Sequence, residues 1–408
     1  MSPTIKKGAA SPRRLLPHSI GFTLIATAIL FTLTFSLRHA WAKQLPADDL
    51  TAHEWGTFTS ISGPDGRPMD WLTLSASTNL PSFIEHFRDV KFKGGLRGTV
   101  RMETPVLYFY SPRETTVSVN VSFSRGLITE WYPHADSVNP TLTTRDFSLY
   151  NLKAPGAISW NSVHIDPSAA PDFPSDKSEN PYYAARQTSS APLSVERSSE
   201  QRSEKFLFYR GVAAFAPPLS ATLYSDDTVH LQNVSAEPIS DVILFERRGG
   251  KLGYRVLGPL RDEASLPMPT LGGSLDSLTS HLEGVLISQG LYPDEAHAML
   301  ETWKTSWFEE GARLIYIVPR TFVDSVLPLN IKPAPTKTVR VFLARLELIT
   351  PATQQALESA FTTGDSATLA KYSRFLDPIL EYMLQQSTDE ARQQRLLSYL
   401  NSMPIDAR

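Results

Sequence analysis

The sequence of 408 residues contains no cysteine. This absence excludes disulfide bonds, thiolate metal ligands and a cysteine nucleophile, and also a lipoprotein, whose lipid is attached to a cysteine. The sequence also lacks Gly-x-Ser-x-Gly, so the usual serine-hydrolase nucleophile turn has no counterpart. The glycine-rich residues 94–98 do not lie between a strand pattern and a helix pattern, which argues against a phosphate-binding loop.

Long hydrophobic runs are scarce, and the clearest is the uncharged stretch at residues 20–37. Basic residues precede it, and Ala40-Trp41-Ala42 follows it with the small-x-small pattern that signal peptidase accepts. We therefore expect residues 1–42 to be a signal peptide. The alternative is an uncleaved membrane anchor, because this run is just long enough to span a bilayer. In both cases we predict an exported protein, periplasmic or secreted, or tethered to the inner membrane by residues 20–37.

Acidic residues outnumber basic ones in the part of the chain that remains after cleavage. Removing residues 1–42 takes away five of the 39 Lys and Arg residues and no Asp or Glu. The remaining 34 basic and 42 acidic residues give a net charge of −8. Nucleic acids and anionic membrane surfaces attract a cationic face, so we expect no nucleic-acid partner. We expect contact with a membrane only through the N-terminal segment, if it stays uncleaved.

The hydrophobic pattern changes from strand-like to helix-like along the chain. Residues 117–123 alternate strictly between apolar and polar, which predicts a strand, and residues 124–126 predict a hairpin turn into a strand at 127–131. After Leu271 the apolar residues fall at helical spacing, first in residues 275–285 and then in residues 293–307. We expect an α+β fold with β-sandwich-like N-terminal and central sheets, followed by a helix-rich C-terminal part.

These patterns divide the chain into three predicted parts. Residues 1–42 are the signal peptide or anchor, residues 43–260 form one or more β-rich domains, and residues 261–408 form the helix-rich α+β part. Within the β-rich part, residues 134–204 contain many Pro, Ser, Asn and Asp residues and only short apolar runs. We expect a long irregular insertion there, which is either a binding loop or a poorly ordered segment.

Three short segments place charged side chains among aromatic residues: residues 53–59, 130–134 and 307–313. A carboxylate among aromatic rings loses hydration, and its pKa rises unless a cation or a hydrogen-bond donor compensates. Such groups serve as acids, bases or ligands, but they also form ordinary buried ion pairs. Strand residues two apart share a face, so a carboxylate at position 103 is expected beside Arg101. Our catalytic candidates are Glu103, Glu130, Glu309, Glu310 and Arg313.

The histidine and carboxylate side chains in these segments would suit a divalent metal ion as a cofactor. His53, Glu54 and His134 are the candidate ligands, and together with Glu130 they offer the nitrogen and oxygen atoms that zinc or a similar ion accepts. The helical zinc-protease motif is absent, because no second histidine lies four residues after His53. A metal site therefore requires the fold to bring separate loops together.

Three blocks of the sequence carry a resemblance to a known group of proteins. They are HEWGTFT at residues 53–59, RMETPVLYFY at residues 101–110 and WFEEG at residues 307–311. They resemble blocks of an uncharacterised exported protein family of environmental bacteria, and the resemblance spans most of the chain after residue 42. The family has no established activity, so the resemblance implies export and transfers no catalytic residue.

Two classes of function stay open from the sequence. The first is a non-catalytic protein that binds a ligand or a component of the cell envelope, with aromatic residues that stack on the ligand. The second is a metal-assisted or acid/base hydrolase that acts on an extracytoplasmic substrate. We favour the first, because no complete catalytic constellation can be assembled from the sequence.

Overall fold

The computed structural model describes residues 49–73, 80–86, 96–140, 152, 155–176 and 179–402. The predicted signal peptide or anchor at residues 1–42 lies outside the described residues. From Asp49 onward the chain forms a single contact unit. Within the described ranges, none of the helices combines the length and the apolar character that crossing a bilayer requires.

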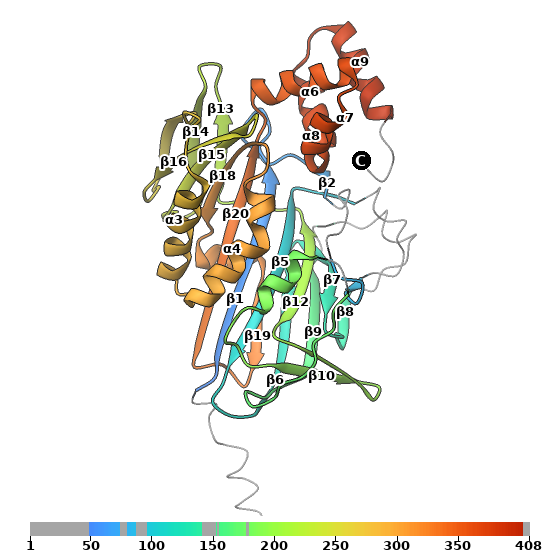
Figure 1. Cartoon of the computed structure of the whole chain (residues 1–408), viewed down its shortest axis with the longest axis vertical. Helices are drawn as coiled ribbons and strands as arrows, with labels where there is room; N and C mark the ends of the chain where they lie inside the picture. Colours follow the sequence, from blue (N-terminus) through green and yellow to red (C-terminus); the bar gives the residue numbers. More distant parts are fainter. Residues whose placement is uncertain are drawn as a thin grey trace, which may run out of the picture. The chain divides into compact units, whose positions relative to one another are not determined.

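Among the described residues, the largest sheet has nine strands in the order β16-β15-β18-β20-β1-β5-β12-β7-β3. In chain order these strands are β1 (Thr51–Ile61), β3 (Glu85–His86), β5 (Val100–Tyr110), β7 (Gly126–Tyr132), β12 (Leu207–Ala213), β15 (Val242–Arg248), β16 (Lys251–Leu257), β18 (Gly311–Ile317) and β20 (Lys337–Leu348). β1 and β20 pair in parallel, whereas the other neighbours are antiparallel. The last strand of the sheet in chain order therefore lies beside the first (Figure 1).

This pairing bears on the part of the chain that we expected to be a separate C-terminal unit. The strands β18 and β20 belong to the same sheet as β1 and β15, on both sides of the boundary predicted near residue 260. The sheet thus continues across that boundary.

Strand β1 is buried on both faces, as a central strand covered by two layers must be. Trp55 belongs to the core on one face, while Phe58 stacks on Phe342 of β20 on the other face, with ring centroids 5.0 Å apart. Gly56 lies against the same phenylalanine, because a Cβ atom there would come within 2.8 Å of the Phe342 ring. A side chain at position 56 would therefore push β1 and β20 apart.

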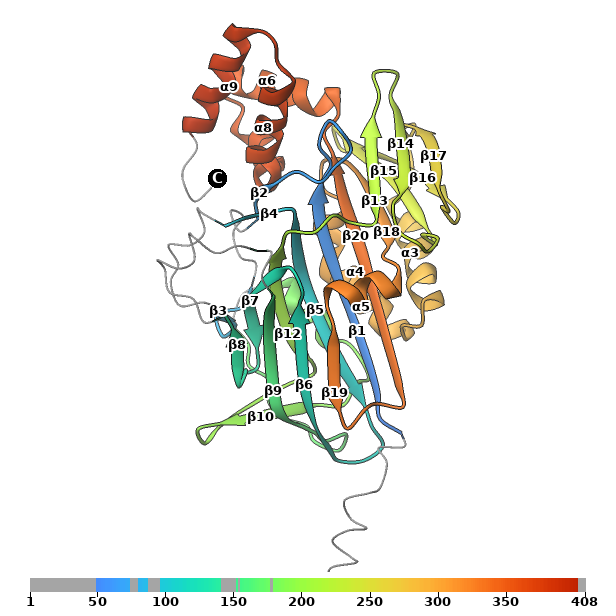
Figure 2. The same cartoon turned by 180° about the vertical axis from the view of Figure 1, so that it is seen from behind.

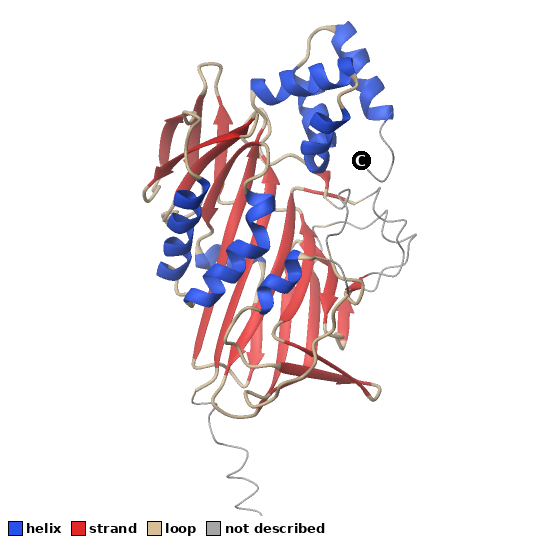
Figure 3. Ribbon diagram, in the orientation of Figure 1, coloured by secondary structure: helices blue, strands red, loops and turns tan. Residues whose placement is uncertain are grey.

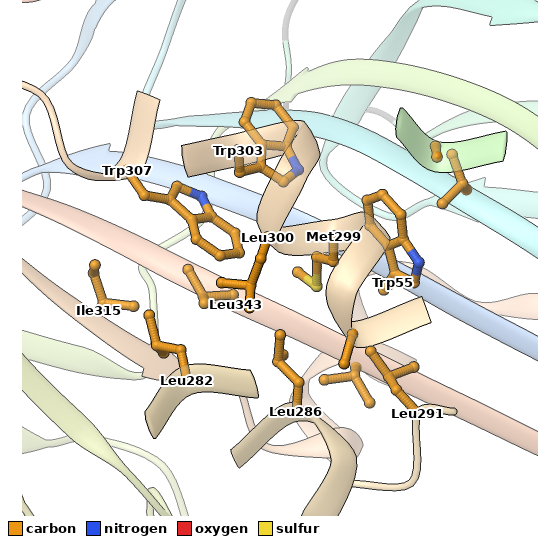
Figure 4. Packing of buried hydrophobic residues seen from close by; sticks show 14 of the residues in the cluster. Trp55, Leu282, Leu286, Leu291, Met299, Leu300, Trp303, Trp307, Ile315 and Leu343 are labelled. Atoms are coloured by element: carbon orange, nitrogen blue, oxygen red, sulfur yellow. The ribbon is translucent and has the colours of Figure 1, made fainter. Parts of the chain in front are cut away.

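Two helices, α3 (Leu275–Ser288) and α4 (Pro293–Trp307), cover one face of the nine-stranded sheet (Figure 1). Their helical spacing was predicted from the sequence and is confirmed, with Ser274 as the N-cap of α3 and Pro293 in the first turn of α4. Leu282 of α3, Trp303 of α4 and Trp55 of β1 belong to one apolar cluster (Figure 4).

A second sheet, nearer the viewer in Figure 2, covers the other face of the first. It has six described strands, in the order β11-β10-β9-β6-β19 with β8 beside β9. These strands are β6 (Thr115–Phe123), β8 (Ser137–Asn139), β9 (Gly156–Ile165), β10 (Leu193–Arg197), β11 (Glu200–Glu204) and β19 (Leu329–Lys332). The alternation predicted for residues 117–123 is confirmed, because the apolar residues of β6 are buried and the polar ones are not. Phe123 of β6 contacts Phe215, which also packs on Phe58 of the first sheet.

The hairpin predicted between β6 and β7 is wrong. β6 pairs with β9 and β19, whereas β7 pairs with β12 and β3 in the other sheet. The physical reason lies in their burial: β6 exposes one face, as an outer layer does, while β7 is buried along almost its whole length. The turn at residues 124–125 therefore carries the chain from one layer to the other.

The irregular insertion expected at residues 134–204 is also corrected by the structure. Its described part contains β8 to β11 and a 3-10 helix, η2 (Pro181–Arg186). The apolar residues of β9, such as Ile158 and Trp160, are completely buried. Burial against the neighbouring layer thus stabilises strands in a segment whose composition favours loops.

The remaining described elements are small sheets and helices. They are β2 (Trp71–Leu72), β4 (Arg97–Gly98), β13 (Leu219–Leu223), β14 (Thr228–Asn233), β17 (Glu263–Pro267), α5 (Arg320–Val326), α6 (Pro351–Thr363), α7 (Ser366–Lys371), η3 (Ser373–Phe375), α8 (Leu376–Gln386) and α9 (Glu390–Ser402). The C-terminal helices contribute Leu380 and Leu396 to an apolar cluster that also contains Trp71 and Ile61. Figure 3 shows these helices grouped in blue beyond the ends of the red strands. With 27% helix and 40% strand, the predicted α+β class is confirmed.

The close approach of β1 and β20 can be tested by adding one methyl group. We expect Gly56→Ala to lower the free energy of unfolding by about 1–3 kcal/mol, because the Cβ atom would overlap the Phe342 ring. Gly284→Ala is the matched control, since open space surrounds this helical glycine and the change should stabilise α3 by about 0.5–1 kcal/mol. Urea unfolding measures both, and equal effects would contradict the proposed crowding.

Candidate functional site

Buried charged side chains cross the nine-stranded sheet on the face that carries α3 and α4. We call them the buried charge row, and its members are Glu130 of β7, Arg210 of β12, Arg101 and Glu103 of β5, Arg345 and Glu347 of β20, and Arg313 of β18. They share one face because strand residues two apart point the same way and directly paired residues face the same side. Three of the catalytic candidates belong to this row.

Arg313 holds the turn that contains the WFEEG block. Its Nη1 donates to the carbonyl oxygens of Trp307 and Glu309, at 2.9 and 2.7 Å, and its Nη2 donates to that of Glu310 at 2.8 Å. Its Nε donates to Glu347 at 2.8 Å. Arg313 is fully buried, and all these contacts are internal, so the side chain stabilises the turn after α4.

Glu309 and Glu347 meet the second buried arginine of this region. Arg345 donates to both carboxylates, and to the Ser306 carbonyl oxygen at 2.6 Å. Burial lowers the pKa of the Arg345 guanidinium, but the two carboxylates outweigh that effect and raise it. Burial likewise acts to raise the pKa of Glu347, and the charges of Arg313 and Arg345 lower it overall. This end of the buried charge row is therefore a mutually neutralised network.

The other end of the row contains Glu103 and Glu130. Glu103 accepts a hydrogen bond from the Thr59 hydroxyl at 3.0 Å and pairs with Arg101, at 3.3 Å. Glu130 accepts from the Thr129 hydroxyl and lies opposite Arg210 in the strand register. Burial, together with the positive charge of Arg101, lowers the pKa of Arg210 to about 9. These carboxylates stabilise buried arginines, which is a structural use of both catalytic candidates.

His53 and Glu54, two of the candidate metal ligands, lie on opposite faces of β1. His53 Nδ1 is 2.7 Å from Glu295 Oε2 of α4, and its ring stacks on Tyr292 at 4.5 Å. Glu54 instead binds Arg340 of β20 and the Tyr209 hydroxyl of β12. The alternation of a strand therefore separates two residues that are adjacent in sequence.

The third candidate ligand, His134, lies in an open groove with different partners. Its Nδ1 contacts Glu85 of β3, and its Nε2 is 3.3 Å from Glu200 of β11. Arg202 joins the two carboxylates, donating to Glu85 at 3.0 Å and to Glu200 at 2.9 Å. Hydrogen bonds from Arg202 and then His134 lower the pKa of Glu200. We call these four side chains the His134 network.

The groove around the His134 network has a volume of about 1550 Å³. Its walls come from β3, from the end of β7, from β8 and from the turn between β10 and β11. Two half-buried aromatic rings, those of Phe83 and Trp131, line it. The Trp131 indole N–H donates to Glu85 at 2.8 Å, and the Phe83 ring packs edge-on against Tyr132 at 4.9 Å. Polar and aromatic groups are thus held in place before any ligand arrives.

The structure does not gather the predicted site residues into one centre. Glu103, Glu130, Glu309 and Arg313 belong to internal networks, and Glu310 accepts a hydrogen bond from the Gly249 amide at 2.6 Å. Across the described ranges, no group of three or more His, Asp or Glu side chains has an arrangement that could hold a metal ion.

Sequence reasoning missed the groove residues that accompany His134. Glu85, Glu200 and Arg202 carry no motif, and the last two lie in the segment that we expected to be irregular. The signal that pointed toward the groove was the charged aromatic segment at residues 130–134, which supplies Trp131 and His134 to its wall.

Comparisons with known proteins show little. No family model matches the chain, and no curated protein matches it. Among solved structures, the Fcho1 mu homology domain of Danio rerio with bound Eps15 peptide is 8% identical, with a TM-score of 0.28, over 74% of this chain and 97% of that chain. The yeast delta-COP-I mu-homology domain is 9% identical, with a TM-score of 0.27, over 74% and 96%. Likeness at this level supports no conclusion about function.

The neutralised end of the buried charge row generates a stability prediction. Arg345→Met leaves Glu309 and Glu347 without a main donor, so we expect the free energy of unfolding to fall by about 3–5 kcal/mol. Lys304→Met is the control, because it removes an exposed pair with Glu301 and should cost about 0–1 kcal/mol. Urea unfolding at neutral pH compares the two, and similar losses would argue against a strong buried network.

The same variant should change how stability depends on pH. Because the folded-state pKa of Glu347 is lowered, its contribution is present above the pKa of the unfolded chain and is lost as pH falls through the folded value. Removing Arg345 removes part of that lowering, so the loss of stability in acid should become shallower. An unchanged acid dependence would contradict this role of Arg345.

Proposed function

We propose that this protein is a non-catalytic binding protein, and that its ligand is a carbohydrate held in the groove around the His134 network. The observation that carries the proposal is the groove itself, with about 1550 Å³ of space, two half-buried aromatic rings and a pre-arranged set of charged groups. Binding sites are commonly hollows with apolar walls and a few fixed polar groups.

The chemistry of the lining suits a sugar. A sugar ring has an apolar C–H face that packs on an aromatic ring, and hydroxyl groups at its edge that donate and accept hydrogen bonds. Phe83 and Trp131 supply the rings, and Glu85, Glu200 and Arg202 supply acceptors and donors beside them. The size and openness of the groove fit several linked sugar units better than a single one.

The same network favours binding over hydrolysis. Glycoside hydrolysis needs a carboxylic acid with a raised pKa that can protonate the leaving oxygen. The pKa of Glu200 is lowered, because Arg202 and His134 stabilise its charged form. Glu85 already accepts hydrogen bonds from Trp131 and Arg202. Glu200 is therefore suited to recognising hydroxyl groups and poorly suited to donating a proton.

Two variants of Trp131 test the proposal. We expect calorimetric titration of the full chain with soluble oligosaccharides of glucose, N-acetylglucosamine and mannose to reveal binding to at least one of them. Trp131→Ala should weaken that binding by about tenfold or more, because it removes an aromatic face, whereas Trp131→Phe should retain most of it. Tyr224→Ala removes an exposed aromatic residue outside the groove and is the control. Absence of binding to every oligosaccharide, or equal binding by all variants, would sink the proposal.

We also propose that the protein works outside the cytoplasm, and what supports this is the pattern of residues 1–42. Fusion of the full chain to alkaline phosphatase, which is active only after export, should yield an active reporter, and N-terminal sequencing should find Lys43 as the first residue. An inactive fusion would contradict export. An active fusion that keeps residues 20–37 would instead identify the tethered form.

A further inference from the structure

A second hollow lies far from the His134 network in the sheet order, where β15 ends, β18 begins and α6 and α7 approach. Its volume is about 200 Å³. The side chains that matter for its chemistry are Glu246, Glu310, Lys371 and Tyr372, and all of them line it. Because typical ligand pockets occupy about 300–1,000 Å³, this pocket suits a very small molecule.

Glu246 of β15 is the residue that points to a ligand. It is only 5% exposed and lines the pocket. Its ion-pair partner is Arg248, whose Nε atom lies 3.5 Å from Glu246 Oε1. The Arg248 side chain is 55% exposed. The contact with Arg248 is longer than a normal N–H···O hydrogen bond, so a donor in the pocket would improve the hydrogen bonding of the buried Glu246 carboxylate.

The charges around Glu246 indicate which kind of hydrogen-bond donor would bind to it. Burial raises the pKa of Glu246, Arg248 opposes this, and the negative charges of Asp227 and Glu310 raise it further. A positively charged group in the pocket would relieve that repulsion. Lys371, at the end of α7, also lines the pocket and is exposed, so it can meet a negative group there.

We propose that this pocket binds a small zwitterion, such as a free α-amino acid, whose ammonium group donates to Glu246 and whose carboxylate meets Lys371. The charged residues around these 200 Å³ of space are Glu246, Glu310, Arg247, Arg248 and Lys371. They offer partners for both charges of a molecule whose charged groups lie a few atoms apart. This site is independent of the groove around the His134 network, and either can fail without the other.

Calorimetric titration of the full chain with glycine, methylammonium chloride and sodium acetate tests the proposal. We expect glycine to bind more tightly than methylammonium, and acetate not to bind. Glu246→Gln keeps the shape of the side chain and removes its charge, so it should weaken glycine binding by about tenfold or more. Glu301→Gln, which removes a carboxylate on α4 outside this pocket, is the matched control and should leave glycine binding unchanged.

Lys371→Met should remove the preference for glycine over methylammonium while leaving methylammonium binding intact. Glycine binding that persists in Glu246→Gln, equal binding of glycine and methylammonium by the unaltered chain, or no binding of any probe would each overturn the proposal.

Stability measurements show whether Glu246→Gln still folds. Because the folded-state pKa of Glu246 is raised, its charged form costs stability near neutral pH, and the unaltered chain gains stability as pH falls through that pKa. The variant should therefore unfold at an equal or higher temperature at neutral pH. A lower unfolding temperature would mean that Glu246 is a structural partner of Arg248, which would also overturn the proposal.

Discussion

The parallel pairing of β1 with β20 is the constraint on which the rest of the structure depends. It joins residues 286 positions apart, such as Glu54 and Arg340, and it places the earliest described strand at the centre of the sheet. The neighbours on both sides, β5 and β18, are ordered outward from this pair. Because the pair is buried on both faces, it needs one layer of helices and one layer of strands to cover it.

The buried charge row shows the cost of charged residues near the centre of such a sheet. Burying an isolated ion is costly, so buried charges persist where partners neutralise them. Around Arg345 this neutralisation raises the arginine pKa, whereas burial, together with the nearby charge of Arg101, lowers the pKa of Arg210. Charged residues that looked like acids and bases in the sequence therefore hold the sheet and its connecting turns together.

The two sites that we propose lie toward the edges of the nine-stranded sheet. The groove around the His134 network adjoins β3, the last strand at one side, while the pocket at Glu246 adjoins β15, next to the last strand at the other side. The central strands β1 and β20 are buried on both faces along most of their length. Edge regions combine buried anchoring residues with access to solvent, which both proposed sites require.

The sequence by itself determined the α+β class, the helices α3 and α4 and the amphipathic strand β6, because these depend on periodicity within one element. It also showed that Arg101 and Glu103 share a face, which follows from strand geometry. Only the tertiary structure decided that β6 and β7 belong to different sheets, that Glu54 points away from His53 and its partner Glu295, and that His134 meets Glu85 and Glu200. These facts depend on pairing between distant segments, and local patterns do not encode which segments pair.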